Sequence, residues 1–329
     1  MSAIRTVLVT GAGGFIGSHL VETLLARGLR VRALVRYNGR NSYGHLELLA
    51  AQKPAGLEVV AGDVTDAFFV NEICRGMDAV CHLAALIGIP YSYVAPASYV
   101  DANVRGTLNI LEAAKSHRTK RIIVTSTSEV YGTALYTPID EAHPLQGQSP
   151  YSASKIGADK MAEAYHRSFE VPVVTLRPFN TYGPRQSARA VIPTVLSQAL
   201  SGADCIRLGS LDPERDLTFV TDTAEAFALA LEKPGIEGET IHFGQGNAIS
   251  VGDLAKLCLK VTGSRATIEQ DAARVRPAKS EVGLLLCNAD KARKLLGWEP
   301  KVTLEDGLAR AAGYIRENLA AFKAGTFLV

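Results

Sequence analysis

The stretch that decides the fold lies near the start of the chain, where residues 7–17 read Val-Leu-Val-Thr-Gly-Ala-Gly-Gly-Phe-Ile-Gly. An apolar run ends here and a helical pattern begins. Gly11 permits a tight turn, Gly14 lets a phosphate approach the backbone, and Gly17 lets the helix pack closely on the strand. The free N–H groups of that helix attract an anion. The segment predicts a dinucleotide site with the contact residues Gly11, Gly14, Phe15, Ile16 and Gly17.

Strand and helix patterns alternate through the first half of the chain. The apolar runs are continuous, as strands buried on both faces are, and fall at residues 6–10, 31–35, 57–61, 79–83, 121–125 and 171–176. Helical spacing occurs at residues 15–27, 46–51, 67–75, 97–117 and 151–169. This alternation predicts an α/β fold, with a Rossmann-like doubly wound parallel sheet and helices on both faces.

The alternation of strands and helices ends after residue 178. Pro178, Gly183 and Pro184 interrupt it, and shorter elements follow. We therefore expect a cofactor-binding domain over residues 1–178 and a smaller mixed α/β lobe over residues 179–329 that holds the substrate. Later strands are free to return to the first domain.

Composition excludes several classes of function. The chain of 329 residues has 35 Lys and Arg against 33 Asp and Glu, a net charge of +2, so no basic field for nucleic acid or a membrane surface is expected. The five cysteines lack metal or disulfide spacing and are expected to be buried thiols. No signal peptide and no run of the ~18 apolar residues of a membrane helix is found. We predict a cytoplasmic protein without a metal site.

The acidic residue that usually binds the adenosine ribose is missing from this sequence. The second strand normally ends in an acidic residue that binds the ribose, but here the sequence is Arg36-Tyr37-Asn38. Arg36 can pair with a 2′-phosphate, which favours NADP over NAD; alternatively Arg36 covers the adenine or faces solvent while Asn38 binds the ribose. Asp63 and Val64 follow the third strand and are expected at the adenine, unless Asp63 merely caps a turn.

Tyr151-Ser152-Ala153-Ser154-Lys155 carries the second chemical signal. Tyr151 and Lys155 are four residues apart and share one helical face. A tyrosine is a poor base at neutral pH, but a neighbouring ammonium and an oxidised nicotinamide lower its pKa. Tyr151 can then exchange a proton with a substrate hydroxyl while hydride leaves the adjacent carbon.

Residues 125–132, Thr-Ser-Thr-Ser-Glu-Val-Tyr-Gly, follow the fifth apolar run and emerge at the edge of the sheet where ligands bind. With this segment the chain resembles the extended short-chain dehydrogenase/reductase family over nearly its whole length. The resemblance also rests on the glycine turn, Tyr151/Lys155 and residues 82–85, 103–107, 177–180 and 296–300. It implies a tightly bound NAD or NADP contacted by Leu83, Ala84, Ala85 and Pro178, a nucleotide-sugar lobe, and a homodimer through a four-helix bundle.

Sugar-nucleotide 4,6-dehydratases of that family carry Thr-Asp-Glu or Thr-Ser-Glu after this strand, and this chain has Thr127-Ser128-Glu129. The resemblance implies that Tyr151 and the cofactor oxidise C4 of a hexose and that Glu129 removes the C5 proton. The C6 hydroxyl then leaves as water and hydride returns to C6, giving a 4-keto-6-deoxy sugar. Ser128 is a weak acid, so Glu129 is expected to act as base and acid, directly or through water; the alternative is a solvated loop residue.

Further stretches, at residues 35–42, 86–93, 177–186, 215–220 and 276–282, narrow the resemblance to GDP-N-acetylglucosamine 4,6-dehydratases of legionaminic acid biosynthesis. By that resemblance Asn180 meets the sugar diphosphate, and Arg215 and Arg276 bind its phosphates through their forked donors. A surface ion pair is the alternative for each arginine alone. The predicted hexose contacts are Tyr91, Ser92 and Thr127.

Three other functions remain open at this point. A UDP-glucuronate decarboxylase also resembles the chain at residues 127–129, but it requires an arginine for the substrate carboxylate. A 4-epimerase leaves Glu129 without a role. A non-catalytic cofactor-binding sensor predicts a damaged Tyr/Lys pair or glycine turn, and both are intact here.

Overall fold

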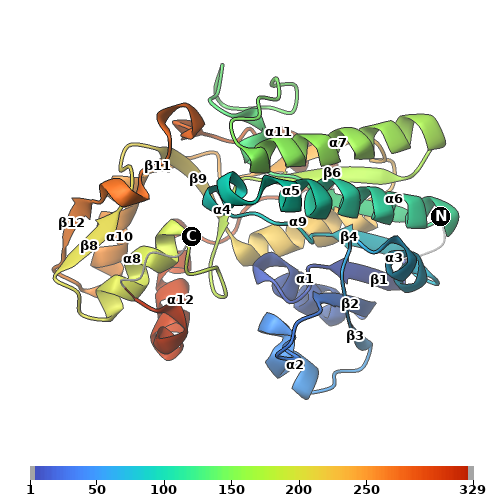
Figure 1. Ribbon diagram of the computed structural model, residues 1–329, viewed down its shortest axis with the longest axis horizontal. Helices are drawn as coiled ribbons and strands as arrows, with labels where there is room; N and C mark the ends of the chain where they lie inside the picture. The colour runs from blue at the N-terminus through green and yellow to red at the C-terminus, as the bar shows by residue number, and fades with distance from the viewer. Residues whose placement is uncertain (1–3, 325–329) are drawn as a thin grey trace.

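Seven parallel strands form the centre of the molecule in the computed structural model, which describes residues 4–324 (Figure 1). Their order is β10-β6-β5-β4-β1-β2-β3. From β1 the chain first adds strands on one side, β2 and β3, and then on the other, starting with β4, as in doubly wound dinucleotide-binding folds. The predicted α/β class and all six expected strands are confirmed. The strands are β1 (Thr6–Thr10), β2 (Arg30–Arg36), β3 (Leu57–Gly62), β4 (Ala79–His82), β5 (Arg121–Thr125), β6 (Val173–Pro178) and β10 (Thr240–Phe243).

Helices cover both faces of this sheet, because its central strands are apolar on both sides. The expected burial of residues 57–61 is wrong, since β3 is an edge strand and has no fully buried residue. On one face α1 (Phe15–Ala26) packs beside α9 (Val220–Glu232). On the other face lie α3 (Ala67–Cys74), α6 (Gly106–Ser116) and α7 (Pro150–Phe169), with α6 between its two neighbours. The short helix α2 (Glu47–Ala51) follows β2. All five residues of β1 are buried between the two helical layers.

The predicted helix over residues 97–117 is not a single regular α-helix. It consists of α5 (Pro96–Tyr99), a π-helical segment at Val100–Arg105, and α6. The wider turn places Asn103 inside, where its side chain accepts from Leu86 N at 2.8 Å and donates to Leu86 O at 3.0 Å. The spacing of apolar residues in the sequence does not reveal these hydrogen bonds with Leu86. They are the physical reason why the segment departs from the single regular α-helix that was predicted.

The second half of the chain forms a smaller mixed lobe, seen at the left of Figure 1. A four-stranded group and a two-stranded pair lie against helices with their own apolar core. The elements are β7 (Asn180–Tyr182), β8 (Cys205–Leu208), β9 (Glu214–Phe219), β11 (Ala248–Ser250), β12 (Thr267–Gln270), β13 (Leu284–Leu285), α8 (Val191–Leu200), α10 (Val251–Thr262) and α12 (Leu304–Glu317). The division at residue 178 stays a prediction, because α9 and β10 lie beyond it and yet belong to the large sheet's layers.

Of the five cysteines, Cys74, Cys81, Cys258 and Cys287 are buried and Cys205 is half-buried, and all are free thiols. No helix within residues 4–324 is both long enough and apolar enough to span a membrane.

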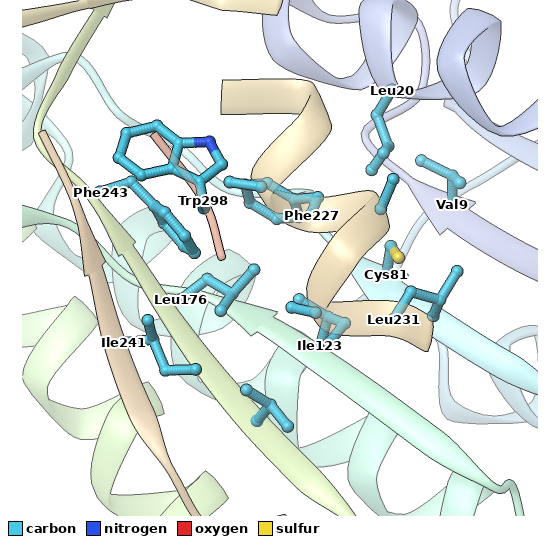
Figure 2. Close-up of a cluster of buried hydrophobic side chains, with 14 of the residues drawn as sticks. Val9, Leu20, Cys81, Ile123, Leu176, Phe227, Leu231, Ile241, Phe243 and Trp298 are labelled. Carbon is cyan, nitrogen blue, oxygen red and sulfur yellow. The ribbon is translucent and has the colours of Figure 1, made fainter. Parts of the chain in front are cut away.

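Trp298 ties the late part of the chain to the large sheet. It lies beyond α11 (Asp290–Leu296), is 1% exposed, and packs edge-on against Phe243 of β10 with ring centroids 5.1 Å apart (Figure 2). Its indole N–H donates to the carbonyl of Asp222 in α9 at 2.9 Å. The ring therefore holds together two elements that return to the first domain.

Replacing this ring should cost much of the stability of the sheet. We expect Trp298→Ala to lower the free energy of unfolding by about 3–5 kcal/mol, because it leaves a cavity and removes the indole hydrogen bond. Urea unfolding followed by circular dichroism measures this loss. Phe68→Ala, at a side chain that is 92% exposed, should change the same quantity by less than about 0.5 kcal/mol; equal effects of the two variants would contradict the assigned packing.

Candidate active site

One large cavity, of about 1430 Å³, is lined both by the carboxyl ends of the parallel strands and by residues of the second lobe. The cavity brings together every site residue expected from the sequence except Ser92. The lining includes Gly11, Gly14, Phe15, Ile16, Gly17, Arg36, Asn38, Asp63, Val64, Leu83, Ala84, Ala85, Tyr91, Thr127, Ser128, Glu129, Tyr151, Lys155, Pro178, Asn180, Arg215 and Arg276.

The glycine turn has room only for glycine at its two ends. A Cβ atom on Gly17 would lie 2.2 Å from the carbonyl oxygen of Gly11, and one on Gly11 would lie 2.8 Å from Ala84 N. Gly11 also has a positive φ of 69°. The N-cap of α1 is Gly14, which offers no side-chain acceptor, so the first N–H groups of the helix face the cavity end. This is a cradle for an anionic group.

At the adenosine end, the side chains of Asn38 and Asp63 make hydrogen bonds within their own loops. The Asn38 side chain donates to Ser42 O at 2.8 Å and accepts from Arg40 N at 3.1 Å, so it organises its own loop. Asp63 accepts from the backbone and the hydroxyl of Thr65, at 2.9 and 2.8 Å. Partial burial opposes the shift, but these hydrogen bonds and the Arg36 charge hold the pKa of Asp63 below its usual value. Arg36 itself is 77% exposed and 3.9 Å from Asp63.

Tyr151 and Lys155 lie in the first turns of α7, which the sequence positions well. Ser149 caps the helix through a reciprocal pair with Ser152, and Pro150 occupies the first helical position. Both functional side chains are buried. Burial raises the pKa of Tyr151, opposed by a hydrogen bond with Thr127 and reinforced by the charge of Glu129. This environment therefore favours the protonated phenol.

Thr127, Ser128 and Glu129 form the turn that follows β5. The Thr127 hydroxyl accepts from Glu129 N at 3.2 Å and starts a short 3₁₀ turn, Ser128–Tyr131. Ser128 is buried, whereas Glu129 is half-buried and its charge is felt by both Tyr151 and Arg215. The turn therefore brings one carboxylate beside the phenol and the arginine side of the cavity.

Two arginines meet in the second lobe around a carboxylate that sequence reasoning left without a role. Arg215 on β9 and Arg276 lie 3.4 and 3.5 Å from the same oxygen of Glu281. Arg215 is only 8% exposed. Burial lowers the pKa of its guanidinium, and the charges of Glu129 and Glu281 oppose that effect. The quoted stretch at residues 276–282 contained Glu281, but only the fold shows it between the two guanidinium groups.

The residues expected at the hexose divide into two groups. Tyr91 on α4 (Ile89–Val94) is 41% exposed and lines the cavity. Ser92 is fully buried and donates to Ile89 O at 2.7 Å, so the structure does not bring it to the cavity. The helical turn rotates adjacent residues onto different faces, which separates the two.

Buried polar atoms in the cavity wall indicate that a polar ligand belongs there. Within residues 4–324, three lining side chains have a buried oxygen atom with no hydrogen-bond partner: Thr125 Oγ1, Asn180 Oδ1 and Gln186 Oε1. Such atoms are rare in folded proteins unless a ligand or water satisfies them. Together with the glycine cradle, these residues fit a dinucleotide and a second polar ligand. No group of three or more His, Cys, Asp or Glu side chains in the same range could hold a metal ion.

The fold and this cavity, which spans the sheet edge and the second lobe, are those of a Rossmann enzyme of the extended short-chain dehydrogenase/reductase type. The family model for GDP-mannose 4,6 dehydratase matches residues 8–311. The chain therefore belongs to that family of NAD(P)-dependent hydro-lyases, the nucleotide-sugar 4,6-dehydratases.

Individual relatives are similar along their whole length. A dTDP-glucose 4,6-dehydratase of Actinoplanes sp. is 33% identical over 317 residues, which are 95% of this chain and 98% of that protein. The structure of DesIV, a dTDP-glucose 4,6-dehydratase from Streptomyces venezuelae with NAD bound, superposes with a TM-score of 0.86 at 32% identity, covering 97% of this chain and 99% of that one. A UDP-glucuronic acid 4-epimerase from Bacillus cereus, in complex with UDP-glucuronic acid and NAD, gives a TM-score of 0.87 at 29% identity, covering 95% of this chain and 100% of that one.

Proposed function

We propose that this enzyme converts GDP-N-acetylglucosamine to its 4-keto-6-deoxy derivative, with Tyr151, Lys155 and Glu129 as the catalytic residues. The observation that supports the residue roles is that Glu129, Tyr151 and Arg215 line one cavity, where the charge of Glu129 acts on both other groups. The base and the hexose follow from the resemblance of residues 35–42, 86–93, 177–186, 215–220 and 276–282 to GDP-N-acetylglucosamine dehydratases.

Binding sets up the reaction. Arg215 and Arg276 pair with the diphosphate, for which a forked guanidinium is a good partner, and the amide of Asn180 supplies a further hydrogen bond. The substrate anion competes with Glu281 for both arginines, since Glu281 already contacts them. The glycine cradle and the Lys155 side chain would hold the dinucleotide, which would supply a hydride acceptor for C4 and a hydride donor for C6.

The phenol of Tyr151 begins the chemistry as a general base. With the Lys155 ammonium and a positively charged ring nearby, the phenolate is favoured and takes the proton of the C4 hydroxyl. The Thr127 hydroxyl, which lowers the pKa of the phenol, can donate to the phenolate and stabilise it. The C4–H bond breaks at the same time, which leaves a ketone at C4.

Glu129 then performs the elimination. The C4 ketone acidifies the C5 proton, and the Glu129 carboxylate removes it. The protonated carboxyl donates the proton to the C6 hydroxyl as the C6–O bond breaks, so water leaves and a C5–C6 double bond forms. When the hydride is returned to C6, Glu129 delivers to C5 a proton that it takes up from water, and Tyr151 releases to water the proton from the C4 hydroxyl, so the protons balance. Ser128 is buried and a weak acid, so the carboxyl of Glu129 performs both transfers.

A 4-epimerase uses the same first step and returns hydride to C4, so the epimerase neighbours share the fold and the Tyr/Lys pair. Elimination in addition needs a second acid/base at the C5–C6 side of the sugar. Glu129 supplies a carboxylate in that region, which supports the dehydratase over the epimerase. It also distinguishes the enzyme from a sensor that binds cofactor without turnover.

A substrate panel tests this function directly. We expect GDP-N-acetylglucosamine to give a 4-keto-6-deoxy product, detected by mass spectrometry as loss of water, at a higher kcat/KM than GDP-mannose, dTDP-glucose or UDP-N-acetylglucosamine. Glu129→Gln should lower kcat by at least about 100-fold while cofactor affinity stays the same, because only the proton transfers at C5 and C6 are lost. Accumulation of a C4 epimer, or release of carbon dioxide from UDP-glucuronate, would overturn the proposal.

We also propose NADP as the preferred cofactor. The last residue of β2 is Arg36 and not an acid, and Arg40 also lines the cavity at this end. Arg36 is largely exposed, with Asp63 at 3.9 Å as its nearest carboxylate, so it is free to turn toward a 2′-phosphate. Structures of relatives contain NAD, which makes the Arg36 position the point to test.

Removing the Arg36 guanidinium should separate the two cofactors. We expect Arg36→Ala to weaken NADP binding by about 10- to 100-fold and to leave NAD binding unchanged, because a charge-assisted contact to the 2′-phosphate is lost. Calorimetry on protein stripped of cofactor measures both affinities. The control is Arg75→Ala, which removes an exposed arginine paired with Glu72. Equal weakening of NAD and NADP by Arg36→Ala would contradict the cofactor assignment.

A homodimer through the α6 and α7 face is the final part of the proposal. The two helices lie side by side in Figure 1 and pack on each other. Val100 and Phe169 leave apolar side chains 54% and 53% exposed near this face. We expect sedimentation to give about twice the chain mass of 35.1 kDa, and Val100→Glu to shift the equilibrium toward monomer because it places a charge in the interface. A wild-type monomer at all concentrations would contradict the dimer.

A further inference from the structure

The turn at residues 126–131, here called the catalytic turn, holds the Glu129 side chain in place only through its backbone. In the part of the chain that the structure describes, the hydrogen bonds of Glu129 are those of its main chain. Its N–H donates to Thr127 Oγ1 at 3.2 Å, and its carbonyl accepts from Gly132 N at 3.3 Å. The position of the carboxylate therefore depends on how the two ends of the turn are fixed.

The first end of the catalytic turn is fixed by Ser126. Its N–H donates to the carbonyl of Leu176 on β6 at 2.7 Å, and its hydroxyl donates to Asp159 Oδ2 on α7 at 2.6 Å. Ser126 and Asp159 are each 4% exposed. A hydrogen bond shielded from water in this way is stronger than one at the surface. This end is therefore tied both to the sheet and to the helix that carries Tyr151.

The second end is fixed by the hydroxyl of Tyr131, whose side chain is fully buried. Arg177 Nη1 donates to this hydroxyl at 2.6 Å, and the same hydroxyl lies 2.5 Å from His242 Nε2. Arg177 of β6 and His242 of β10 are opposite each other in the parallel register, so their side chains point to the same face of the sheet. Two neighbouring strands therefore hold one hydroxyl.

The protons of this contact have one consistent arrangement. Burial raises the pKa of Tyr131, although Arg177 opposes the effect, so its side chain is a neutral phenol. Burial, followed by the Arg177 charge, lowers the pKa of His242 to about 3, so the imidazole is also neutral. The phenol oxygen accepts from the guanidinium, which leaves its own proton for His242 Nε2. The imidazole proton is then on Nδ1, 3.9 Å from Glu141 Oε1.

The guanidinium of Arg177 joins the two ends of the turn. Its Nη2 and Nε donate to Asp159 Oδ2 at 2.9 and 3.2 Å, and that oxygen also accepts from Ser126. Arg177 is 6% exposed, so this ion pair is shielded from water. A guanidinium is planar and its donors have fixed directions. Arg177 therefore sets the separation between Ser126 and Tyr131, the residues at the two ends of the catalytic turn.

We propose that Tyr131 and Arg177 are positioning residues that form a clamp with Asp159: the clamp holds both ends of the catalytic turn and thereby keeps the Glu129 carboxylate at C5 and C6 of the sugar. None of the three clamp side chains lines the active-site cavity, so each acts through the turn. The inference rests on the proposed role of Glu129 in elimination. Oxidation at C4 depends on Tyr151 of α7 and needs the second end of the clamp much less.

The two halves of the reaction test the clamp in Tyr131→Phe, which removes only the hydroxyl at the second end. Oxidation of C4 produces reduced nicotinamide, and elimination followed by hydride return consumes it, so stopped-flow absorbance records both steps. We expect the decay of this signal to slow about 10-fold, because the Glu129 carboxylate is less often in place at C5. Formation of the signal should change by less than about twofold.

The matched control is Tyr182→Phe. Tyr182 of β7 is also fully buried, and its hydroxyl donates to the carbonyls of Thr303 and Leu304 in the second lobe. Both rates should be unchanged in this variant. A merely structural role of Tyr131 would lower both rates together, in proportion to the folded fraction. An unchanged decay in Tyr131→Phe, or equal slowing of formation and decay, overturns the proposal.

A second variant tests the other end of the clamp. Tyr131→Phe leaves one buried polar atom of Arg177 and one of His242 without a partner, which can destabilise the fold. Ser126→Ala instead removes the hydrogen bond to Asp159 and keeps the contacts of Tyr131. We expect it to slow the decay by a similar factor. Thermal unfolding identifies the folded variants, and a folded Ser126→Ala with wild-type decay also overturns the clamp.

A measurement without turnover separates this inference from the proposed function. Amide hydrogen exchange, followed by mass spectrometry on a peptide that spans residues 126–132, reports how often the catalytic turn opens. We expect exchange in this peptide to be about 10-fold faster in Tyr131→Phe and unchanged in Tyr182→Phe. If the wild-type enzyme is inactive on every nucleotide sugar but the faster exchange is present, only the proposed function fails. If exchange is unchanged in folded Tyr131→Phe, the clamp is wrong.

Discussion

The close contact between Gly17 and the carbonyl of Gly11 is the constraint on which the rest of the active site depends. No side chain fits between them, so α1 begins directly at the carboxyl end of β1. The turn after β4 packs against the same place, with the N–H groups of Leu83 and Ala84 donating to the Thr10 hydroxyl at 3.2 and 3.1 Å. Sheet order reverses between these two strands, and the opening that results is the dinucleotide cradle.

From this cradle the cavity extends to the buried Tyr151 and Lys155 and to the arginines of the second lobe. The chain carries a net charge of only +2, so the anion site depends on local arginines and not on a general field. Glu281 keeps Arg215 and Arg276 together before any ligand arrives. The Tyr151 phenol and the Lys155 amine are buried, where each charge is costly unless a partner is present. In the proposed mechanism, local pairing would therefore govern both anion binding and proton transfer.

Most of the regular structure could be predicted from the sequence. Apolar runs located the six expected strands of the sheet, and for the central strands the reason is that burial on both faces leaves a continuous apolar pattern. The π-helical segment at Val100–Arg105 could not be predicted, because it depends on contacts of Asn103 with Leu86, a residue outside the helix. Tyr91 and Ser92 were expected together, but the helix sends one to the cavity and buries the other.

The sequence by itself determined the glycine spacing, the Tyr151–Lys155 pair and the Thr127-Ser128-Glu129 turn, because each is a local pattern whose geometry follows from a few adjacent dihedral angles. Only the tertiary structure decided that Glu281 lies between two arginines and that Asp159 shares Oδ2 among three donors while Oδ1 has none. It also decided that Trp298 joins α9 to β10. These contacts join residues far apart in the chain, and the packing of strands and helices, which no local pattern records, sets their distances.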